Sequence, residues 1–109
     1  MLFRSATLAS ATERVVRVWN VERGQERATL EGHRGMVRAL AFSPDGRVLA
    51  SGGQDQAVRF WQLMDAGVRP GPVYQWPIGA VHALAFSPDG LTAAAAGDSG
   101  DILIWDVED

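Results

Sequence analysis

The stretch ALAFSPDG at residues 39–46 decides the fold, because the same eight letters return at residues 83–90, 44 positions later. A chance match of that length is improbable in a chain of 109 residues. A sequence period of this size is typical of repeat architectures. We therefore expect a structure that is built from internal repeats.

The last four letters, Ser43-Pro44-Asp45-Gly46, predict a tight turn. Proline's restricted φ suits the second position of a type I turn, serine and aspartate supply local hydrogen bonds, and glycine accepts a positive φ. Such a turn commonly closes a short hairpin. We therefore expect a strand over 37–42, a second strand over 47–51, and a copy of this hairpin around residues 87–90.

The first strand of the hairpin is apolar on both faces. Leu40 and Phe42 fall on one face, whereas Ala39 and Ala41 fall on the other. A strand of this kind is expected to be covered on both sides, with bulky residues towards one neighbour and small residues towards the other.

The repeat extends beyond the hairpin. Three segments rich in β-branched residues end in tryptophan, and these tryptophans, Trp19, Trp61 and Trp105, are separated by 42 and 44 residues. Each segment is typical of a β-strand. No amphipathic helix is expected, and a repeat of this length with several short strands indicates a propeller blade rather than a helical solenoid.

Three units follow from this spacing: an incomplete first repeat (1–31), a second repeat with the best match (32–75), and a third repeat that lacks its outer strand (76–109). The segment Asp65–Pro72 is rich in turn residues and is expected to be a surface connection. Trp76 is assigned to an outer strand. The expected strands are Leu2-Phe3, 7–10, 15–19, 27–30, 36–42, 47–52, 57–62, 73–76, 80–86, 91–96 and 101–106.

In these features the chain resembles the Trp-Asp (WD) repeat family over essentially its whole length. The resemblance implies an all-β fold, a fragment of a WD-repeat β-propeller with about two and a half four-stranded blades, in which this chain alone does not close the ring. Gln62 departs from the family's usual final aspartate, whereas Trp105-Asp106 keeps it. The matching residues of the middle unit are Gly32-His33, Val37, Leu40, Phe42, Ser43-Pro44-Asp45-Gly46, Leu49-Ala50-Ser51-Gly52, Asp55 and Val58-Arg59-Phe60-Trp61.

The resemblance also implies a buried hydrogen-bonded tetrad in the middle unit, formed by His33, Ser51, Asp55 and Trp61, with the indole N–H donating to the serine. A closed network satisfies all four polar groups.

The other two units lack the complete set. The first unit has Ser10 and Trp19, with Glu13 near the aspartate position, but no histidine. In the third unit Trp105 remains and His82 is out of register. Its positions for histidine, serine and aspartate hold Pro77, Ala95 and Ser99.

Composition indicates a globular chain, 47% hydrophobic, with no apolar run long enough to span a bilayer and no signal-peptide core at its start. The absence of cysteine excludes disulfides and thiolate chemistry and fits a cytoplasmic protein. All ten basic residues are arginine, a codon bias that suggests a GC-rich, bacterial genome.

The net charge of −3 is distributed unevenly. All ten arginines and seven acidic residues lie at or before Arg69, whereas residues 70–109 hold six acidic residues and no arginine. Scattered loop charges in solvent explain most of this asymmetry. Neither nucleic acid nor a membrane is expected as a partner.

The length of the chain limits what it can form. Propellers close with about four to eight blades, and this chain supplies fewer than three. Its end blades are therefore expected to expose apolar faces that normally meet another blade. We interpret the chain as a fragment or truncated product of a larger ring. A subunit that completes the ring by self-association, with its basic first part against an acidic second part, is the alternative.

The sequence carries no convincing catalytic or cofactor site. His33 and His82 have no metal-ligand spacing, and Ser43 and Ser51 have no adjacent base in a nucleophile motif. Gly52-Gly53 lacks the lysine that ends a phosphate-binding loop. We therefore expect no enzyme activity, cofactor, metal or small-molecule substrate.

Binding to proteins is the favoured function, because loops on a rigid scaffold carry recognition. In the family, partner peptides often dock on the narrower face of the disc, and Arg34 and Met36 are the preferred contacts here because both residue types are enriched in interfaces. Alternatively, Met36 only caps the channel and Arg34 is merely solvated. The residues that map to this face are Arg34, Met36, Gln54, Gln56, Gly79 and Asp98.

The favoured function is thus a non-catalytic scaffold or adaptor for protein–protein interaction. Two alternatives stay open: a regulatory or sensor propeller attached to an enzyme such as a bacterial signalling kinase or protease, and a short propeller subunit that self-assembles.

Overall fold

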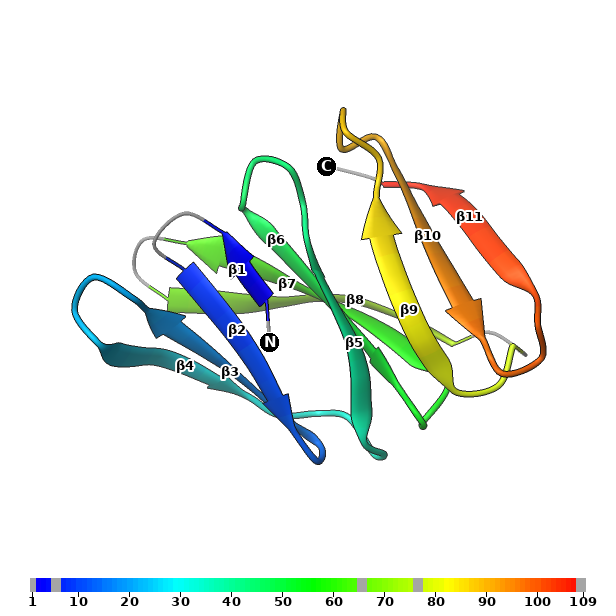
Figure 1. Ribbon diagram of the computed structural model, residues 1–109, viewed down its shortest axis with the longest axis horizontal. Coiled ribbons are helices and arrows are strands. Elements are labelled where there is room, and N and C mark those ends of the chain that lie inside the picture. Colours follow the sequence, from blue (N-terminus) through cyan, green and yellow to red (C-terminus); the bar gives the residue numbers. More distant parts are fainter. Residues whose placement is uncertain (1, 5–6, 65–66, 76–77, 108–109) are drawn as a thin grey trace.

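The structure, a computed structural model, describes residues 2–4, 7–64, 67–75 and 78–107. These residues form eleven strands and no helix, arranged as three antiparallel sheets. Figure 1 shows the sheets side by side, each with its strands in chain order. The all-β architecture predicted from the repeat is therefore confirmed.

The strands follow the predicted segments closely. The first sheet contains β1 (Leu2–Arg4), β2 (Thr7–Thr12), β3 (Val15–Asn20) and β4 (Gln25–Leu30). The middle sheet contains β5 (Val37–Phe42), β6 (Val48–Gly53), β7 (Ala57–Met64) and β8 (Gly67–Gln75). The third sheet contains β9 (Val81–Phe86), β10 (Thr92–Gly97) and β11 (Ile102–Asp106).

The repeated octapeptide forms the same hairpin turn twice. In the middle sheet the Ser43 hydroxyl donates to Asp45 at 2.6 Å, and Asp45 accepts the Arg47 amide at 3.0 Å. The turn is completed by Gly46, whose φ is +73°. In the third sheet Ser87 and Asp89 make the equivalent contact at 2.6 Å. The turn chemistry read from the sequence is thus confirmed.

Two apolar cores lie between the sheets, because alternate residues of the middle sheet point to opposite sides. Leu49 and Trp61 pack against the first sheet, and Leu40 and Phe42 join this cluster as their spacing predicted. The other face, with Val58 and Phe60 among its members, packs against the third sheet. The first cluster contains Ala9, Val16, Val18, Leu30, Leu49 and Trp61, and the second contains Ala50, Val58, Phe60, Ile78, Val81 and Ala95.

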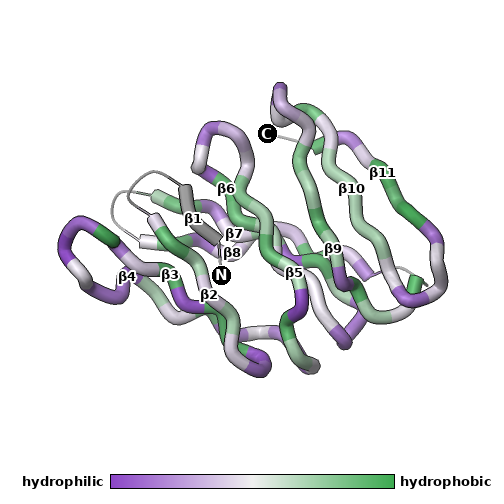
Figure 2. Tube along the Cα trace, in the orientation of Figure 1, coloured by the Kyte–Doolittle hydropathy of each residue, from purple (hydrophilic) through white to green (hydrophobic). Residues whose placement is uncertain are grey.

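The three sheets do not close into a ring (Figure 1). The face of the third sheet that points away from the middle sheet is apolar, and its Ile102 and Ile104 side chains are 66% and 73% exposed. Figure 2 shows this hydrophobic character along β11. The exposed apolar end face expected for an open stack of blades is therefore present.

The prediction of a surface connection at Asp65–Pro72 is wrong for residues 67–72, because these residues belong to β8. Within this segment, Val68 pairs with Leu63, and Pro70 pairs with Trp61 beside a register shift in β7. Proline is tolerated because β8 is the outer edge of its sheet, where a missing N–H costs no ladder bond. Trp76, assigned to an outer strand, lies outside the described residues.

Candidate functional site

Four polar side chains of the middle sheet form one hydrogen-bonded chain, from a loop before β5 to strands β6 and β7. His33 Nδ1 lies 2.9 Å from Asp55 Oδ2, and His33 Nε2 lies 2.7 Å from Ser51 Oγ. The Trp61 indole N–H donates to the same Ser51 oxygen at 2.9 Å. Ser51 is fully buried, and His33 and Trp61 are nearly so.

The protonation states in this chain follow from the environment of His33. Burial lowers the pKa of His33 below its ordinary value of 6.5, and the hydrogen bond and charge of Asp55 offset this only in part. A neutral imidazole donates its Nδ1–H to Asp55 and accepts the Ser51 hydroxyl proton at Nε2. The Ser51 oxygen then remains free to accept the Trp61 N–H. Every donor in the chain therefore has one acceptor.

Asp55 links this buried chain to two surface loops. Its carboxylate accepts the backbone N–H of Arg34 at 3.0 Å and that of Ala57 at 3.3 Å. Burial alone would raise the pKa of Asp55, but these backbone bonds and His33 outweigh it and hold the pKa below 3.8. The carboxylate therefore stays ionised at neutral pH and fixes the 33–36 loop against the 54–56 turn.

The predicted binding residues of the middle sheet project from these two loops. The Gln54 N–H donates to the Met36 carbonyl at 2.9 Å, which places the loops side by side. Arg34, Gln54 and Gln56 line them with Met36, which is 47% exposed, and Arg34 and Gln54 are exposed as well. The structure thus brings four of the predicted residues together on one rim of the middle sheet.

The third sheet has the same loop contact without the buried tetrad. Asp98 N–H donates to the Ala80 carbonyl at 3.0 Å, and Ser99 N–H donates to the Ile78 carbonyl at 3.0 Å. A Cβ added at Gly79 would lie 3.2 Å from the Asp98 side chain. Gly79 and Asp98 therefore lie next to each other. His82, which sequence reasoning left out of the network, is half exposed with its Nε2 3.7 Å from Asp98.

Sequence reasoning missed a third loop on the same rim, the turn between β2 and β3. The Glu13 carbonyl accepts the Val37 N–H at 2.6 Å, so this turn abuts the start of β5, and Arg14 beside it is exposed. In Figure 1 this turn lies at the lower edge of the molecule, as do the starts of β5 and β9. The sequence did contain a signal for this loop, because residues 13–14 join the second and third strands of the first unit, just as residues 54–56 do in the second unit. We call the loop residues 13–14, 34–36, 54–56, 78–80 and 98–100 together the lower rim.

The glycine pair Gly52-Gly53 serves packing rather than phosphate binding. A Cβ at Gly53 would collide with the Met36 carbonyl oxygen, and one at Gly52 would lie 2.6 Å from Val81. Gly97 approaches the Ile78 carbonyl in the same way. These glycines allow the lower-rim loops and the third sheet to come close.

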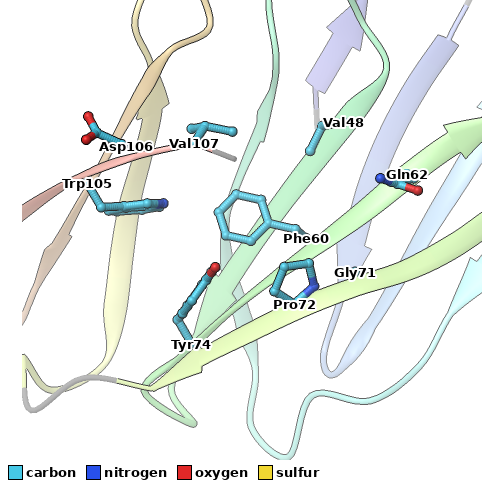
Figure 3. A pocket seen from close by; sticks show the side chains of 9 residues that line it. All are labelled: Val48, Phe60, Gln62, Gly71, Pro72, Tyr74, Trp105, Asp106 and Val107. Carbon is cyan, nitrogen blue, oxygen red and sulfur yellow. The ribbon is translucent and has the colours of Figure 1, made fainter. Parts of the chain in front are cut away.

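A separate cavity of about 160 Å³ lies between the middle and third sheets, near their outer strands (Figure 3). Three aromatic rings converge on it, with Phe60 in edge-on contact with both Tyr74 and Trp105 at centroid distances of 5.8 and 6.0 Å. The lining residues are Val48, Phe60, Gln62, Gly71, Pro72, Tyr74, Trp105, Asp106 and Val107.

In the part of the chain that the structure describes, no three histidine, cysteine or acidic side chains gather in a way that could hold a metal ion. Over the same residues there is no helix that could cross a membrane.

Comparison with curated proteins finds relatives that share one stretch with this chain. The rice small ribosomal subunit protein RACK1y is 43% identical over 58 residues, which cover 53% of this chain and 17% of the relative. The DDB1- and CUL4-associated factor 13 of Dictyostelium discoideum is 41% identical over 49 residues (45% and 11%). A subunit of chromatin assembly factor 1 from chicken is 42% identical over 67 residues (54% and 12%).

The chain thus spans less than a fifth of the length of these relatives. All three come from eukaryotes, so they lend no support to the bacterial origin that the arginine bias suggested.

The family model described as "WD domain, G-beta repeat" matches residues 24–62 and 73–106, more than half of the chain. These two matches contain both copies of the octapeptide hairpin and the tryptophans Trp61 and Trp105 of β7 and β11. Together with the three stacked antiparallel sheets, they show that this chain belongs to the WD-repeat family.

Proposed function

We propose that the chain is part of a non-catalytic scaffold that binds a protein partner through the lower rim. The observation that carries the proposal is the double attachment of this rim in the middle sheet. The Asp55 carboxylate accepts the backbone N–H of Arg34 at 3.0 Å, and the Met36 carbonyl accepts the backbone N–H of Gln54 at 2.9 Å. The side chains of Arg34, Met36 and Gln54 stay accessible to solvent. A surface held in this way loses little conformational entropy when a partner binds.

The composition of the lower rim supports a protein partner. Arginine and methionine are enriched in protein interfaces, and both project from the 34–36 loop. Arg34 on the middle sheet and Asp98 on the third sheet carry opposite charges. Complementary charges across an interface contribute more to the orientation of the partner than to the affinity. The names of the three relatives describe a ribosomal subunit protein, an associated factor and a subunit of an assembly factor, which also supports binding to other proteins.

The test uses peptides that are selected for binding to the full chain from a random phage-displayed library. Arg34→Ala is expected to raise the Kd of the selected peptides about tenfold, equal to ~1.4 kcal/mol, as a central interface arginine would. Arg47→Ala is the matched control, because Arg47 is also exposed but lies in the hairpin turn at the opposite end of β5. An equal loss for both variants, or none for Arg34→Ala, would refute the assignment of the lower rim.

A second candidate function, self-assembly, is favoured by the exposed apolar face of the third sheet, where Ile102 and Ile104 are 66% and 73% exposed. The matching residues of the middle sheet, Val58 and Phe60, are buried against the next sheet. Size-exclusion chromatography with light scattering tests this function. A discrete multimer that Ile104→Asp dissociates would support it, and a monomer would exclude it.

A further inference from the structure

Three arginines lie where the lower rim meets the start of β5. Arg14 follows Glu13, whose carbonyl accepts the Val37 N–H at 2.6 Å. Arg38 follows Val37 in β5, and Arg34 lies in the loop just before this strand. All three arginine side chains are exposed. The first and middle sheets therefore both contribute positive charge to this part of the surface.

These three guanidinium groups have no hydrogen-bond or ion-pair partner among the described residues. Over the same residues, the ion pairs shorter than 4 Å are those of His33 with Asp55 and of His82 with Asp98, and neither includes an arginine. The bond between Arg34 and Asp55 uses the backbone N–H of Arg34, so its side chain is not engaged. The arginine side chains are therefore available to a partner.

The third sheet shows what lies beside the residue that is equivalent to Arg38. In each sheet one extra residue interrupts the pairing of the first two strands, Arg38 in β5 and His82 in β9. A bulge of this kind redirects a side chain. His82 Nε2 lies 3.7 Å from the Asp98 carboxylate, whereas the backbone position of Asp98 is taken in the middle sheet by the uncharged Gln54. The place beside Arg38 is therefore open to a carboxylate from another molecule.

The acidic residues of the rim limit where an anionic partner can lie. Glu13 is the exposed acid beside Arg14. Asp98 and Asp101, also exposed, lie on the turn of the third sheet between β10 and β11. Like charges disfavour an interface and opposite charges set its orientation. An acidic partner is therefore attracted to the arginines of the first and middle sheets and repelled by the third sheet.

We propose that the partner presents an acidic segment to Arg14, Arg34 and Arg38, with carboxylate side chains on both sides of an apolar residue. Arginine forms strong, often bidentate hydrogen bonds with carboxylates. The apolar residue contacts Met36, which lies between Arg34 and Arg38 in the chain and is 47% exposed. This inference rests on the function proposed for the lower rim and adds the chemistry of the partner.

The test titrates the isotope-labelled full chain with the synthetic peptide Gly-Glu-Glu-Leu-Glu-Glu-Gly, capped at both ends, and follows amide resonances by NMR. We expect the largest shifts at residues 14, 34–38 and 54. The Kd is expected to rise with salt concentration, because ions screen exposed charges. A matched peptide with glutamine in place of every glutamate is expected to bind about tenfold more weakly.

Three variants locate the contact on the chain, and all three positions are exposed, so the fold is expected to stay intact. Arg38→Gln is expected to raise the Kd of the acidic peptide about three- to fivefold, the scale of one exposed ion pair. Arg47→Gln removes the same charge at the opposite end of β5 and is the matched control, with a change below about twofold. Gln54→Asp copies the third sheet by placing a carboxylate beside Arg38, and is expected to weaken binding as much as Arg38→Gln does.

Several outcomes would overturn the inference: no binding of the acidic peptide, equal binding of both peptides, equal effects of Arg38→Gln and Arg47→Gln, or tighter binding after Gln54→Asp. A DNA oligonucleotide of the same charge that binds as tightly as the peptide would overturn it too, because the site would then recognise any polyanion.

The phage-selected peptides separate this failure from a failure of the proposed function. If those peptides still lose affinity with Arg34→Ala, the lower rim binds a partner of other chemistry and only the present inference fails. If they do not, both proposals fail.

Discussion

The middle and third sheets share one hairpin sequence but differ in what surrounds it. Both have the Ser-Pro-Asp-Gly turn with the same serine–aspartate contact at 2.6 Å. The middle sheet is covered on both faces, has four strands and contains the complete tetrad. The third sheet is covered on one face and has Ala95 where the middle sheet has Ser51. A local turn motif therefore forms the hairpin in either environment.

The comparison also shows what the tetrad does not do. In both sheets the loop before the first strand is bonded to the turn after the second by equivalent backbone groups, Met36 with Gln54 and Ala80 with Asp98. The loops therefore reach the same positions without the side-chain network. In the third sheet the Ser99 N–H makes a second bond, to the Ile78 carbonyl, whereas in the middle sheet the second attachment runs through the Asp55 carboxylate. The tetrad therefore makes this attachment part of a buried side-chain network, which adds stability and pH dependence.

The largest expected difference concerns the tryptophans. Trp61→Ala should lower the free energy of unfolding by about 3–5 kcal/mol, because it empties a core position and breaks the bond to Ser51. Trp19→Ala should cost clearly less, since Trp19 is only partly buried and lies on the outer face of the first sheet. Denaturant unfolding of the full chain measures both. Equal losses would show that the middle sheet has no special role in stability.

The next effect isolates the tetrad from hydrophobic packing. Ser51→Ala removes only one oxygen but leaves the Trp61 N–H and His33 Nε2 without their partner, at a cost of about 1–3 kcal/mol. Ser10→Ala is the matched control in the first sheet, where the serine accepts the Trp19 N–H at 3.2 Å and no histidine joins the pair among the described residues. It should cost less than about 1 kcal/mol. A control that is as costly as Ser51→Ala would contradict the importance of the closed network.

A smaller effect depends on pH. The folded chain holds the pKa of His33 below 6.5, so the unfolded chain binds protons more readily as the pH falls below that value, and stability declines there. The pKa of Asp55 lies below 3.8, so its contribution is lost only in stronger acid. Unfolding melts between pH 8 and about pH 5 should show the first decline in the wild type and not in His33→Gln. A decline of the same size in the variant would assign it to another group.

The smallest expected difference is between the two turns. The pKa of Asp45 is lowered by the hydrogen bonds from the Ser43 hydroxyl and the Arg47 amide, and that of Asp89 by the equivalent bonds from Ser87 and Leu91. Asp45→Ala and Asp89→Ala should therefore lower the Tm slightly and by the same amount. Clearly unequal Tm values in calorimetry would show that the surrounding sheet alters the turn.

Sequence reasoning reached most of the fold because the chain repeats its pattern. Two copies of one turn and three strands that carry a tryptophan near their ends place the hairpins. The four tetrad residues were identified by resemblance, and the structure brings them within 3.2 Å of one another along the chain of bonds. The 13–14 turn was missed because the lower rim was mapped only for the second and third units.

The sequence alone determined the hairpins, because turn chemistry and alternation of side chains act between residues that are close in the chain. Only the tertiary structure decided the role of the segment that begins at Gly67, because a strand rich in glycine and proline can be recognised only once β7 offers an edge to it. The tertiary structure also decided the cavity beside β11 and the exposure of Ile102 and Ile104. Both depend on which sheet lies next to which, and such contacts join residues that no local pattern connects.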